Sequence, residues 1–492
     1  MTKIKSKISI DIDKIIGEVS PYLFGHFIEH FPRQIYGGIF EEGSPYSDSM
    51  GFRLDVIKTL KEIRPSLIRW PGGNYTSGYH WIWGAGPKNL RKYRKNPHWN
   101  EYENHHFGTT EFFEFCKRIE AEPLICIGIG RDKRNPTPEE AASWVNYCNS
   151  LDCPEAELRN KAGYPEPLNI KWWGLGNECW GEWQIGYYKS AIEYGEDVLK
   201  YMKSMLEVDD TLRFVLVGGD RHFNRKWNED LLSIEEIAHT VEILSWHHYF
   251  QIGDVERVPH LKATLDLRRV ERRLDKIIEL IQETCKSIGR ENPIKIAVDE
   301  WNEFGWEEVN IEKNADPEQY DLAHALYTAG FLNLLIRRAN FIFMANYSPM
   351  VNTRGLIYVN EKGVLLRSSF HVYEVFRECS GGHSVDNQVD SSYLKDSNAL
   401  TLDVSSVRMT ENLVYVYVVN RDEHDTITKF DIPGFSVKRA NAIIITAKDL
   451  RTFNDFKKME ETVPKCYTVE AYKENFELMI PKHSICFIKL HK

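Results

Sequence analysis

Eight segments of the chain each contain a short apolar run that ends in glycine, proline or polar residues. Such runs have the length and boundaries of buried strands. They occupy residues 23–30, 66–74, 122–130, 170–178, 213–220, 243–250, 295–302 and 341–349. Between them, apolar residues recur with helical spacing, most clearly in residues 51–63, 137–149, 187–206, 263–288 and 317–340. Eight alternations of strand and helix predict an α/β fold, the (β/α)8 TIM barrel. The rival, a doubly wound open sheet, would require a glycine-rich phosphate loop after its first strand, and we find none.

The pattern changes after about residue 380. Short alternating segments follow one another there, at residues 400–407, 413–420, 426–432, 442–447 and 476–490. Segments of this kind predict a C-terminal antiparallel β-sandwich, with NRDEHD (420–425) as a hairpin connection. Residues 4–12 alternate in the same way, so we expect this amino-terminal strand to join that sandwich. The predicted division is a catalytic barrel of residues 18–380 and a sandwich of residues 1–17 plus 381–492.

Polar side chains gather where the predicted barrel strands end. In a TIM barrel these carboxyl-terminal ends meet at one mouth, and the chemistry takes place there. The residues concerned are Glu29, His30, Arg69, Asn74, Asn177, Glu178, His247, Tyr249 and Glu300. Glu178 and Glu300 come from different strands and match the pair that glycoside hydrolysis requires: one carboxylic acid protonates the leaving oxygen, and one carboxylate stabilises or attacks the anomeric carbon. Arg69 is expected as catalytic support, because a nearby cation favours the ionised form of a carboxylate.

Composition narrows the possible partners and the compartment. The 492 residues include 13 tryptophans, which suits a protein that presents flat faces to a ligand, and the formal net charge is −10. An acidic balance argues against nucleic acid or a membrane surface as a partner. The nine cysteines form no C-x-x-C pair, and MTKIKSKISIDIDK at the start lacks the apolar stretch of a secretory signal. We therefore expect reduced thiols and a cytoplasmic location.

Four histidines raise the alternative of a metal site. His26 and His30 are four residues apart, and His247 and His248 are adjacent. The first spacing suits ligands on a helix, whereas these residues lie on predicted strands, where adjacent side chains face opposite ways. We expect neither a metal nor another cofactor. Trp180 and Trp183, just past Glu178, can be read equally as loop packing or as sugar platforms.

Four longer motifs resemble glycoside hydrolase family 51, whose best-known members are α-L-arabinofuranosidases. They are FGHFIEHFPRQIYGGIFEEG (24–43), IRWPGGNYTSGYHWIWGAGP (68–87), WGLGNECWGEWQIG (173–186) and VDEWN (298–302). The resemblance implies a retaining mechanism, with Glu178 as general acid/base and Glu300 as nucleophile. By motif position it also implies that Glu29, Asn74 and Asn177 hold furanose hydroxyls, that His247 and Tyr249 support the carboxylates, and that Trp99 lies near the sugar. It further implies a homo-oligomer and suggests a hexamer.

Two departures bear on specificity. Trp180 stands where many family members have aspartate, and Pro349, in YSPMVN (347–352), stands where many have a sugar-binding glutamine. We count Trp180 among the expected substrate contacts. The expected function is exo-acting release of terminal L-arabinofuranose from arabino- or arabinoxylo-oligosaccharides. The alternatives are an endo-β-1,4-glucanase or β-xylosidase on the same chemistry, or a non-catalytic carbohydrate-binding barrel.

Overall fold

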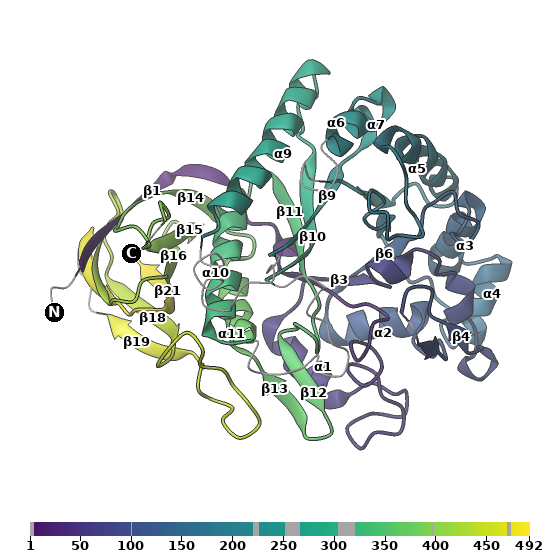
Figure 1. Ribbon diagram of the computed structural model, residues 1–492, viewed down its shortest axis with the longest axis horizontal. Helices are drawn as coiled ribbons and strands as arrows, with labels where there is room; N and C mark the ends of the chain where they lie inside the picture. Colours follow the sequence, from purple (N-terminus) through teal and green to yellow (C-terminus); the bar gives the residue numbers. More distant parts are fainter. Residues whose placement is uncertain are drawn as a thin grey trace.

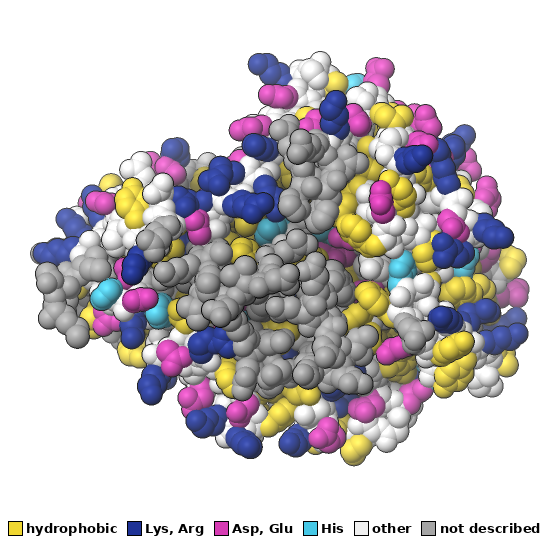
Figure 2. Space-filling model, in the orientation of Figure 1, with side chains coloured by type: hydrophobic (Ala, Val, Ile, Leu, Met, Phe, Trp, Pro, Cys, Tyr) yellow, Lys and Arg dark blue, Asp and Glu magenta, His cyan; other side chains and the backbone are white. Residues whose placement is uncertain are grey.

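The computed structural model describes residues 4–99, 101–219, 226–250, 266–303, 320–395, 397–469 and 474–492. Two parts lie side by side in Figure 1, a barrel surrounded by helices and a β-sheet that contains the first strand, β1, and the last, β21. Helices α10 (Leu322–Ile336) and α11 (Ser368–Phe376) run between the two parts. On the face shown in Figure 2, basic and acidic side chains are interspersed.

The barrel is closed and consists of eight strands in parallel register. Its strands are β2 (Gly25–Phe27), β3 (Leu67–Trp70), β6 (Glu122–Ile127), β7 (Trp172–Leu175), β8 (Arg213–Leu216), β9 (Ile243–Tyr249), β10 (Lys295–Asn302) and β11 (Ile342–Tyr347). Pairing of β11 with β2 closes the ring. Each strand lies inside a predicted segment, so the predicted barrel is confirmed. Most strands end a few residues before the segment does, which places several of the polar residues in the loops at the mouth.

A layer of apolar side chains fills the amino-terminal half of the barrel interior. It comprises Leu67, Leu124, Trp172, Val215, Ile243, Ala297 and Met344, all buried. The Trp172 ring packs edge-on against Tyr22 at 5.4 Å. Each fully buried large side chain of this kind stabilises the fold by about 1.5–3 kcal/mol. Because this layer fills one end of the interior, the polar side chains are confined to the other end.

The helices around the barrel begin where the sequence provides caps. Thr137 and Ser190 each accept a hydrogen bond from the backbone N–H three residues later, at the starts of α3 and α5. In addition to α10 and α11, the described helices are α1 (Leu54–Ile63), α2 (Thr109–Ile119), α3 (Pro138–Asn149), α4 (Pro154–Lys161), α5 (Ala191–Leu206), α6 (Trp227–Leu232), α7 (Glu235–Thr240) and α9 (Arg268–Ser287). The first three residues of two predicted helices, 263–265 and 317–319, lie outside the described residues. Within the described part of the chain, no helix is both long and apolar enough to cross a membrane.

Helix α10 holds the barrel and the sheet together. All of its residues are buried, as expected of a helix that is apolar all round and packs on both sides. One of its few buried polar residues, Asn333, donates to Asp403 on the sheet at 2.9 Å, and Arg337 just after the helix contacts the same carboxylate at 3.0 Å. The two parts therefore share an apolar core and a partly buried ion pair.

The C-terminal sheet has nine strands in the order β19-β18-β21-β16-β15-β14-β1-β17-β20. They are β1 (Ile4–Glu18), β14 (His383–Asp390), β15 (Leu402–Thr410), β16 (Leu413–Asn420), β17 (Thr426–Asp431), β18 (Arg439–Thr446), β19 (Lys465–Val469), β20 (Asn475–Ile480) and β21 (Ser484–His491). The predicted inclusion of the amino-terminal strand is confirmed. Apolar side chains from both halves of the sheet, among them Val416 and Phe430, pack in one buried cluster, as in a sandwich.

Three details of this sheet differ from the prediction. Strand β1 pairs with β17 in parallel, so the sheet is mixed, whereas its other pairings are antiparallel. Residues 420–425 are not a hairpin, because β16 and β17 do not pair with each other. The predicted segment 476–490 is two strands, β20 and β21, separated by a turn. We keep the division into residues 18–380 and 1–17 plus 381–492 as a proposal, supported by the end of β1 at Glu18 and the start of β14 at His383.

Candidate active site

Two glutamates from separate strands meet at the mouth of the barrel. Glu300 belongs to β10 and is buried, and Glu178 lies three residues after β7. One carboxylate oxygen of each and one ring nitrogen of His247 all lie within 4.8 Å of one another. A tight turn brings Glu178 to this position, with Gly176 at φ 96° and Glu178 itself at φ 42°. A side chain at Gly176 would meet the Cys179 sulfur at 2.5 Å, so the turn requires glycine there.

Both oxygens of Glu300 accept hydrogen bonds. The Arg69 guanidinium donates to Oε1 at 2.6 Å, and the Tyr249 hydroxyl donates to Oε2 at 2.8 Å. Arg69 also donates to the Asn177 side-chain oxygen at 2.8 Å. A carboxylate held from both sides by charge-assisted or hydroxyl donors has a fixed orientation. The predicted pairing of Arg69 with Glu300 is therefore present in the structure.

His247 touches three carboxylates at once. Its Nδ1 lies 3.0 Å from Oε1 of Glu178 and 3.7 Å from Oε2 of Glu300, while its Nε2 lies 3.3 Å from Asp299. Burial by itself lowers the pKa of His247, but the charges of Glu300 and Asp299, with the hydrogen bonds, outweigh it and raise this pKa to about 10. Near neutral pH the imidazole is therefore a cation, placed between the two glutamates.

Asp299 is a site residue that sequence reasoning missed. Strand alternation would point it away from Glu300, its neighbour in the chain. The pairing of β10 with β9 shifts register between Ala297 and Glu300, and this irregularity leaves Asp299 buried beside His247. The Ser245 hydroxyl donates to Asp299 at 2.6 Å. Burial raises the pKa of Asp299, but the cations of His247 and Arg69 outweigh it, so this pKa is lowered. The sequence does contain one signal that could have identified Asp299: it and Glu300 are two consecutive acidic residues near the end of a strand.

The second oxygen of Glu178 faces a tryptophan. The Trp183 indole donates to Oε2 of Glu178 at 3.2 Å, and Gln184 lies 3.5 Å from the same atom. Gln184 also donates to Asn74, which links a predicted sugar contact to the carboxylate. The ring of Trp183 is half-exposed and meets Trp180 edge-to-face at 5.5 Å. The indole N–H of Trp180 donates to the Gly218 carbonyl instead, so the indole that donates to Glu178 is that of Trp183.

A third glutamate, Glu29, lies on the other side of Glu300. Its Oε1 accepts from the Tyr75 backbone at 2.9 Å and from the Trp99 indole at 3.3 Å. Burial, reinforced by the charge of Glu300 and opposed by the Tyr75 hydrogen bond, raises the pKa of Glu29 to about 8. Two buried polar atoms here, Oε2 of Glu29 and Nδ2 of Asn177, have no hydrogen-bond partner among the described residues. Unpaired buried atoms of this kind are available for ligand hydroxyls.

Glycines in the PGGN motif make room for these carboxylates. A side chain at Gly72 would meet the Glu29 Cγ at 2.5 Å, and one at Gly73 would approach Oε1 of Glu300 to 3.1 Å. The backbone at Gly73 thus approaches both acids closely.

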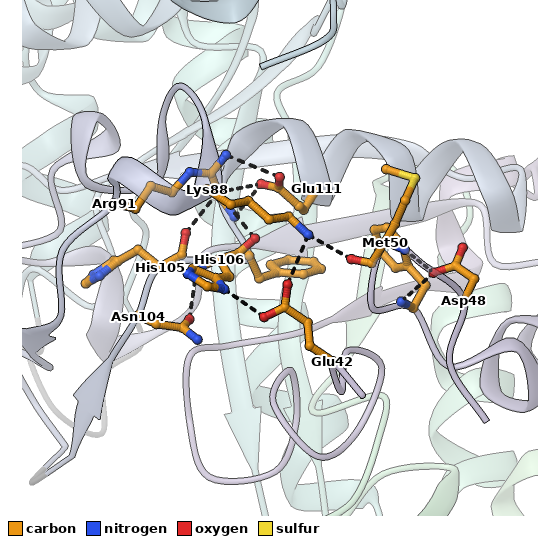
Figure 3. Close-up of polar contacts among 12 residues, drawn as sticks. Glu42, Asp48, Met50, Lys88, Arg91, Asn104, His105, His106 and Glu111 are labelled. Carbon is orange, nitrogen blue, oxygen red and sulfur yellow. Dashed lines mark hydrogen bonds and ion pairs between the residues drawn. The ribbon is translucent and has the colours of Figure 1, made fainter. Parts of the chain in front are cut away.

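Residues that precede and follow Trp99 in the chain, among them Arg91 and His106, belong to the network of polar contacts drawn in Figure 3. Arg91 binds Glu111 at 2.8 Å, Lys88 donates to the Met50 carbonyl at 2.7 Å, and His106 contacts Glu42 at 2.7 Å. These contacts join Lys88 and His106 to the loop between β2 and α1, and Arg91 to α2.

The other three histidines considered for a metal site, His26, His30 and His248, have partners other than Glu178 and Glu300. His26 packs against Tyr373 at 4.7 Å, His248 stacks on Phe331 at 5.6 Å, and His30 contacts Glu103 at 2.6 Å. Among the described residues, only Glu178, His247 and Glu300 are arranged to hold a metal ion. Within this trio, Nδ1 of His247 lies 3.0 Å from Oε1 of Glu178, a hydrogen-bonding distance.

The chain is similar to known proteins along most of its length. Two family models match, "Alpha-L-arabinofuranosidase 1 domain" over residues 59–258 and "Alpha-L-arabinofuranosidase C-terminal domain" over residues 299–484. A probable α-L-arabinofuranosidase C of Aspergillus fumigatus is 32% identical, over 86% of each chain. An intracellular exo-α-(1→5)-L-arabinofuranosidase of Bacillus subtilis is 28% identical, over 96% of each.

Solved structures agree with these relatives. An α-L-arabinofuranosidase from Thermotoga maritima, in complex with arabinose, is 33% identical with a TM-score of 0.87, covering 99% of this chain and 100% of that one. A family 51 α-L-arabinofuranosidase from Thermotoga petrophila is also 33% identical with a TM-score of 0.87, covering 98% of this chain and 99% of that one.

Proposed function

The chain belongs to glycoside hydrolase family 51 and is an α-L-arabinofuranosidase, and from this premise we propose a retaining mechanism with Glu300 as nucleophile and Glu178 as general acid/base. One observation carries the proposal, the approach of the two carboxylates to within 4.8 Å. Retaining glycosidases keep their carboxyl groups about 5–5.5 Å apart, whereas inverting ones leave about 6.5–9.5 Å for a water molecule.

In the first step, a Glu300 oxygen attacks the anomeric carbon while the bond to the leaving oxygen breaks. Glu178 donates its proton to that oxygen, so the leaving group departs as an alcohol. Arg69 and Tyr249 hold the Glu300 carboxylate in place for the attack. The negative charge is on Glu300 before the attack and on Glu178 once its proton has left, and the His247 cation, which contacts both acids, stabilises it in either place.

In the second step, the ionised Glu178 accepts a proton from water, and the resulting hydroxide attacks the anomeric carbon of the ester to Glu300. The ester bond breaks, Glu300 is released as a carboxylate, and Glu178 is protonated again. Two displacements at one carbon return its original configuration.

We propose that Glu29, Asn74, Asn177 and Trp99 bind the terminal furanose. The unpaired atoms of Glu29 and Asn177 support this, because hydroxyl groups of a bound sugar would satisfy both. Trp99 also packs edge-on against Phe31 at 4.6 Å, which limits where its ring can lie. Trp180, beside Trp183, would contact the leaving-group side.

The substrate, location and assembly are proposed from the relatives. The Bacillus subtilis relative is named as an intracellular enzyme that acts from chain ends on α-(1→5) linkages, and the Thermotoga maritima enzyme binds arabinose. We propose that this chain releases terminal arabinofuranose from arabino-oligosaccharides in the cytoplasm. A homo-oligomer, with a hexamer as the specific expectation, can be tested by sedimentation equilibrium.

The nucleophile can be identified by trapping the covalent intermediate. A 2-deoxy-2-fluoro-α-L-arabinofuranosyl donor with a good leaving group should inactivate the enzyme and add one sugar mass to the peptide containing Glu300. Glu300→Ala should take no label and should be inactive on every arabinofuranoside. A label on another residue, or turnover by Glu300→Ala, would overturn the assignment.

A further inference from the structure

Three adjacent strands supply a chain of hydroxyl contacts that ends on Glu300. The Ser348 hydroxyl, one residue after β11, lies 2.6 Å from the Tyr249 hydroxyl at the end of β9. The Tyr249 hydroxyl in turn lies 2.8 Å from Oε2 of Glu300 on β10, the strand between them. The contacts therefore bridge the outer two strands across the carboxylate.

The direction of these hydrogen bonds follows from the chemistry of the groups. An ionised carboxylate can only accept, so Tyr249 must use its single proton on Glu300. Its oxygen is then left as an acceptor, and Ser348 must donate to it. Burial, with the charge of Glu300, raises the pKa of Tyr249 well above its usual value, so the phenol keeps this proton. A phenol that accepts a hydrogen bond is a stronger donor through its own O–H.

The backbone of Ser348 is fixed independently of its side chain. Its N–H donates to the Trp301 carbonyl at 3.1 Å, and its carbonyl accepts from the Asn302 side chain at 2.8 Å. The residue is buried, with 1% of its surface exposed. The hydroxyl is thus presented to Tyr249 from a rigid support, and its loss should leave the local backbone in place.

We propose that Ser348 is a positioning residue for the nucleophile, acting on Glu300 through Tyr249. The proposal rests on the role of Glu300 given above. Ser348 orients the Tyr249 hydroxyl toward Oε2 and strengthens its donation, which favours the ionised carboxylate over the acid. No contact between Ser348 and the substrate is required.

The test is a double-mutant cycle on 4-nitrophenyl α-L-arabinofuranoside. Ser348→Ala should lower kcat/KM by about two- to tenfold, the effect of one hydrogen bond. It should also move the acid limb of the pH profile of kcat/KM to higher pH, because the ionised carboxylate is less favoured. In a Tyr249→Phe background the same substitution should change neither quantity, since the group through which Ser348 acts is gone.

Ser405→Ala provides a matched control. The Ser405 hydroxyl is equally buried and donates to Asn333 at 2.6 Å, but it belongs to the sheet. This variant should leave the acid limb where it is in the wild-type enzyme. Thermal unfolding of all the variants separates loss of folded protein from loss of rate.

The outcomes distinguish this inference from the proposed function. If Ser348→Ala costs as much in the Tyr249→Phe background as in the wild-type enzyme, or leaves the acid limb unmoved, the positioning role is wrong while Glu300 can still be the nucleophile. If Glu300→Ala retains activity, the proposed function itself fails, and the double-mutant cycle no longer reports on a nucleophile.

Discussion

The Trp183 indole donates to Oε2 of Glu178 at 3.2 Å, while His247 contacts Oε1 of the same carboxylate at 3.0 Å. Both oxygens of the proposed acid/base thus have a defined partner on the protein. The leaving-group oxygen must approach one of them to receive a proton. Glu178 therefore marks the side of the site that faces the leaving group, and Trp183 lies on that side.

Glu178→Ala should separate the two steps of the reaction. We expect arabino-oligosaccharide hydrolysis to fall by about 10²–10⁴-fold, the usual contribution of general acid–base catalysis. The first step on aryl arabinofuranosides should persist, because a good leaving group needs no proton, and added azide should restore turnover by forming a glycosyl azide. Equal losses on both substrates without an azide product would contradict the role given to Glu178.

Trp183→Phe should weaken proton donation by Glu178 while keeping an aromatic ring at position 183. It deletes the N–H that contacts Glu178, so kcat/KM on arabino-oligosaccharides should fall by about two- to tenfold. The loss on 4-nitrophenyl arabinofuranoside should be smaller. Trp180→Phe is the control, because its N–H donates to the Gly218 carbonyl rather than to a carboxylate. If both variants affect both substrates alike, Trp183 acts only through packing.

Ligand binding should depend on the protonation of Glu29. Its pKa is raised from 4.5 to about 8, so the folded protein keeps a proton that the unfolded chain loses between these values. The contribution of Glu29 to the free energy of unfolding therefore falls as pH rises from about 4.5 to 8. At pH 7 its carboxyl group is neutral and can donate a hydrogen bond. We expect L-arabinose binding, measured by calorimetry, to weaken as pH rises through about 8.

Glu29→Gln fixes the neutral state at this position. In that variant arabinose affinity should stay level from pH 6 to 9, because the amide does not titrate there. The same decline above pH 8 in the variant and the wild-type enzyme would show that another group is responsible.

Pro349 should broaden selectivity for the terminal sugar. It is buried two residues after the end of β11, and proline offers neither a polar side chain nor an N–H to a sugar hydroxyl. Tyr347 cannot substitute as a platform, because it is fully buried and packs against Trp301 at 5.2 Å. Pro349→Gln should raise the ratio of kcat/KM for arabinofuranoside over xyloside by a few-fold, about the effect of one hydrogen bond. An unchanged ratio would show that this position does not set selectivity.

The barrel and its mouth could be predicted because they depend on simple periodicity. Eight apolar runs of strand length mark the strands, and polar residues after each run mark the mouth, which was enough to single out Glu178 and Glu300. The strand order of the C-terminal sheet was harder to predict. Which strands become neighbours depends on long-range pairing, so neither the parallel contact of β1 with β17 nor the separation of β16 from β17 has a local signal.

The finer parts of the site depend on backbone irregularities. Asp299 enters it through a register shift in β10, and Glu178 through a left-handed turn. Period-two alternation cannot anticipate either. The contact of Trp183 with Glu178 could not be distinguished from one with Trp180, because both follow within five residues and the turn between them decides which indole returns to the carboxylate.

The most direct test of the account is the configuration of the first-formed sugar. Proton NMR can follow hydrolysis of an aryl α-L-arabinofuranoside at enzyme concentrations high enough to outpace mutarotation. Because Glu300 and Glu178 lie close enough for direct attack by a carboxylate, we expect a retaining mechanism, in which α-L-arabinofuranose appears first and the β-anomer only later. Initial appearance of the β-anomer would show a single displacement by water and would contradict Glu300 as the nucleophile.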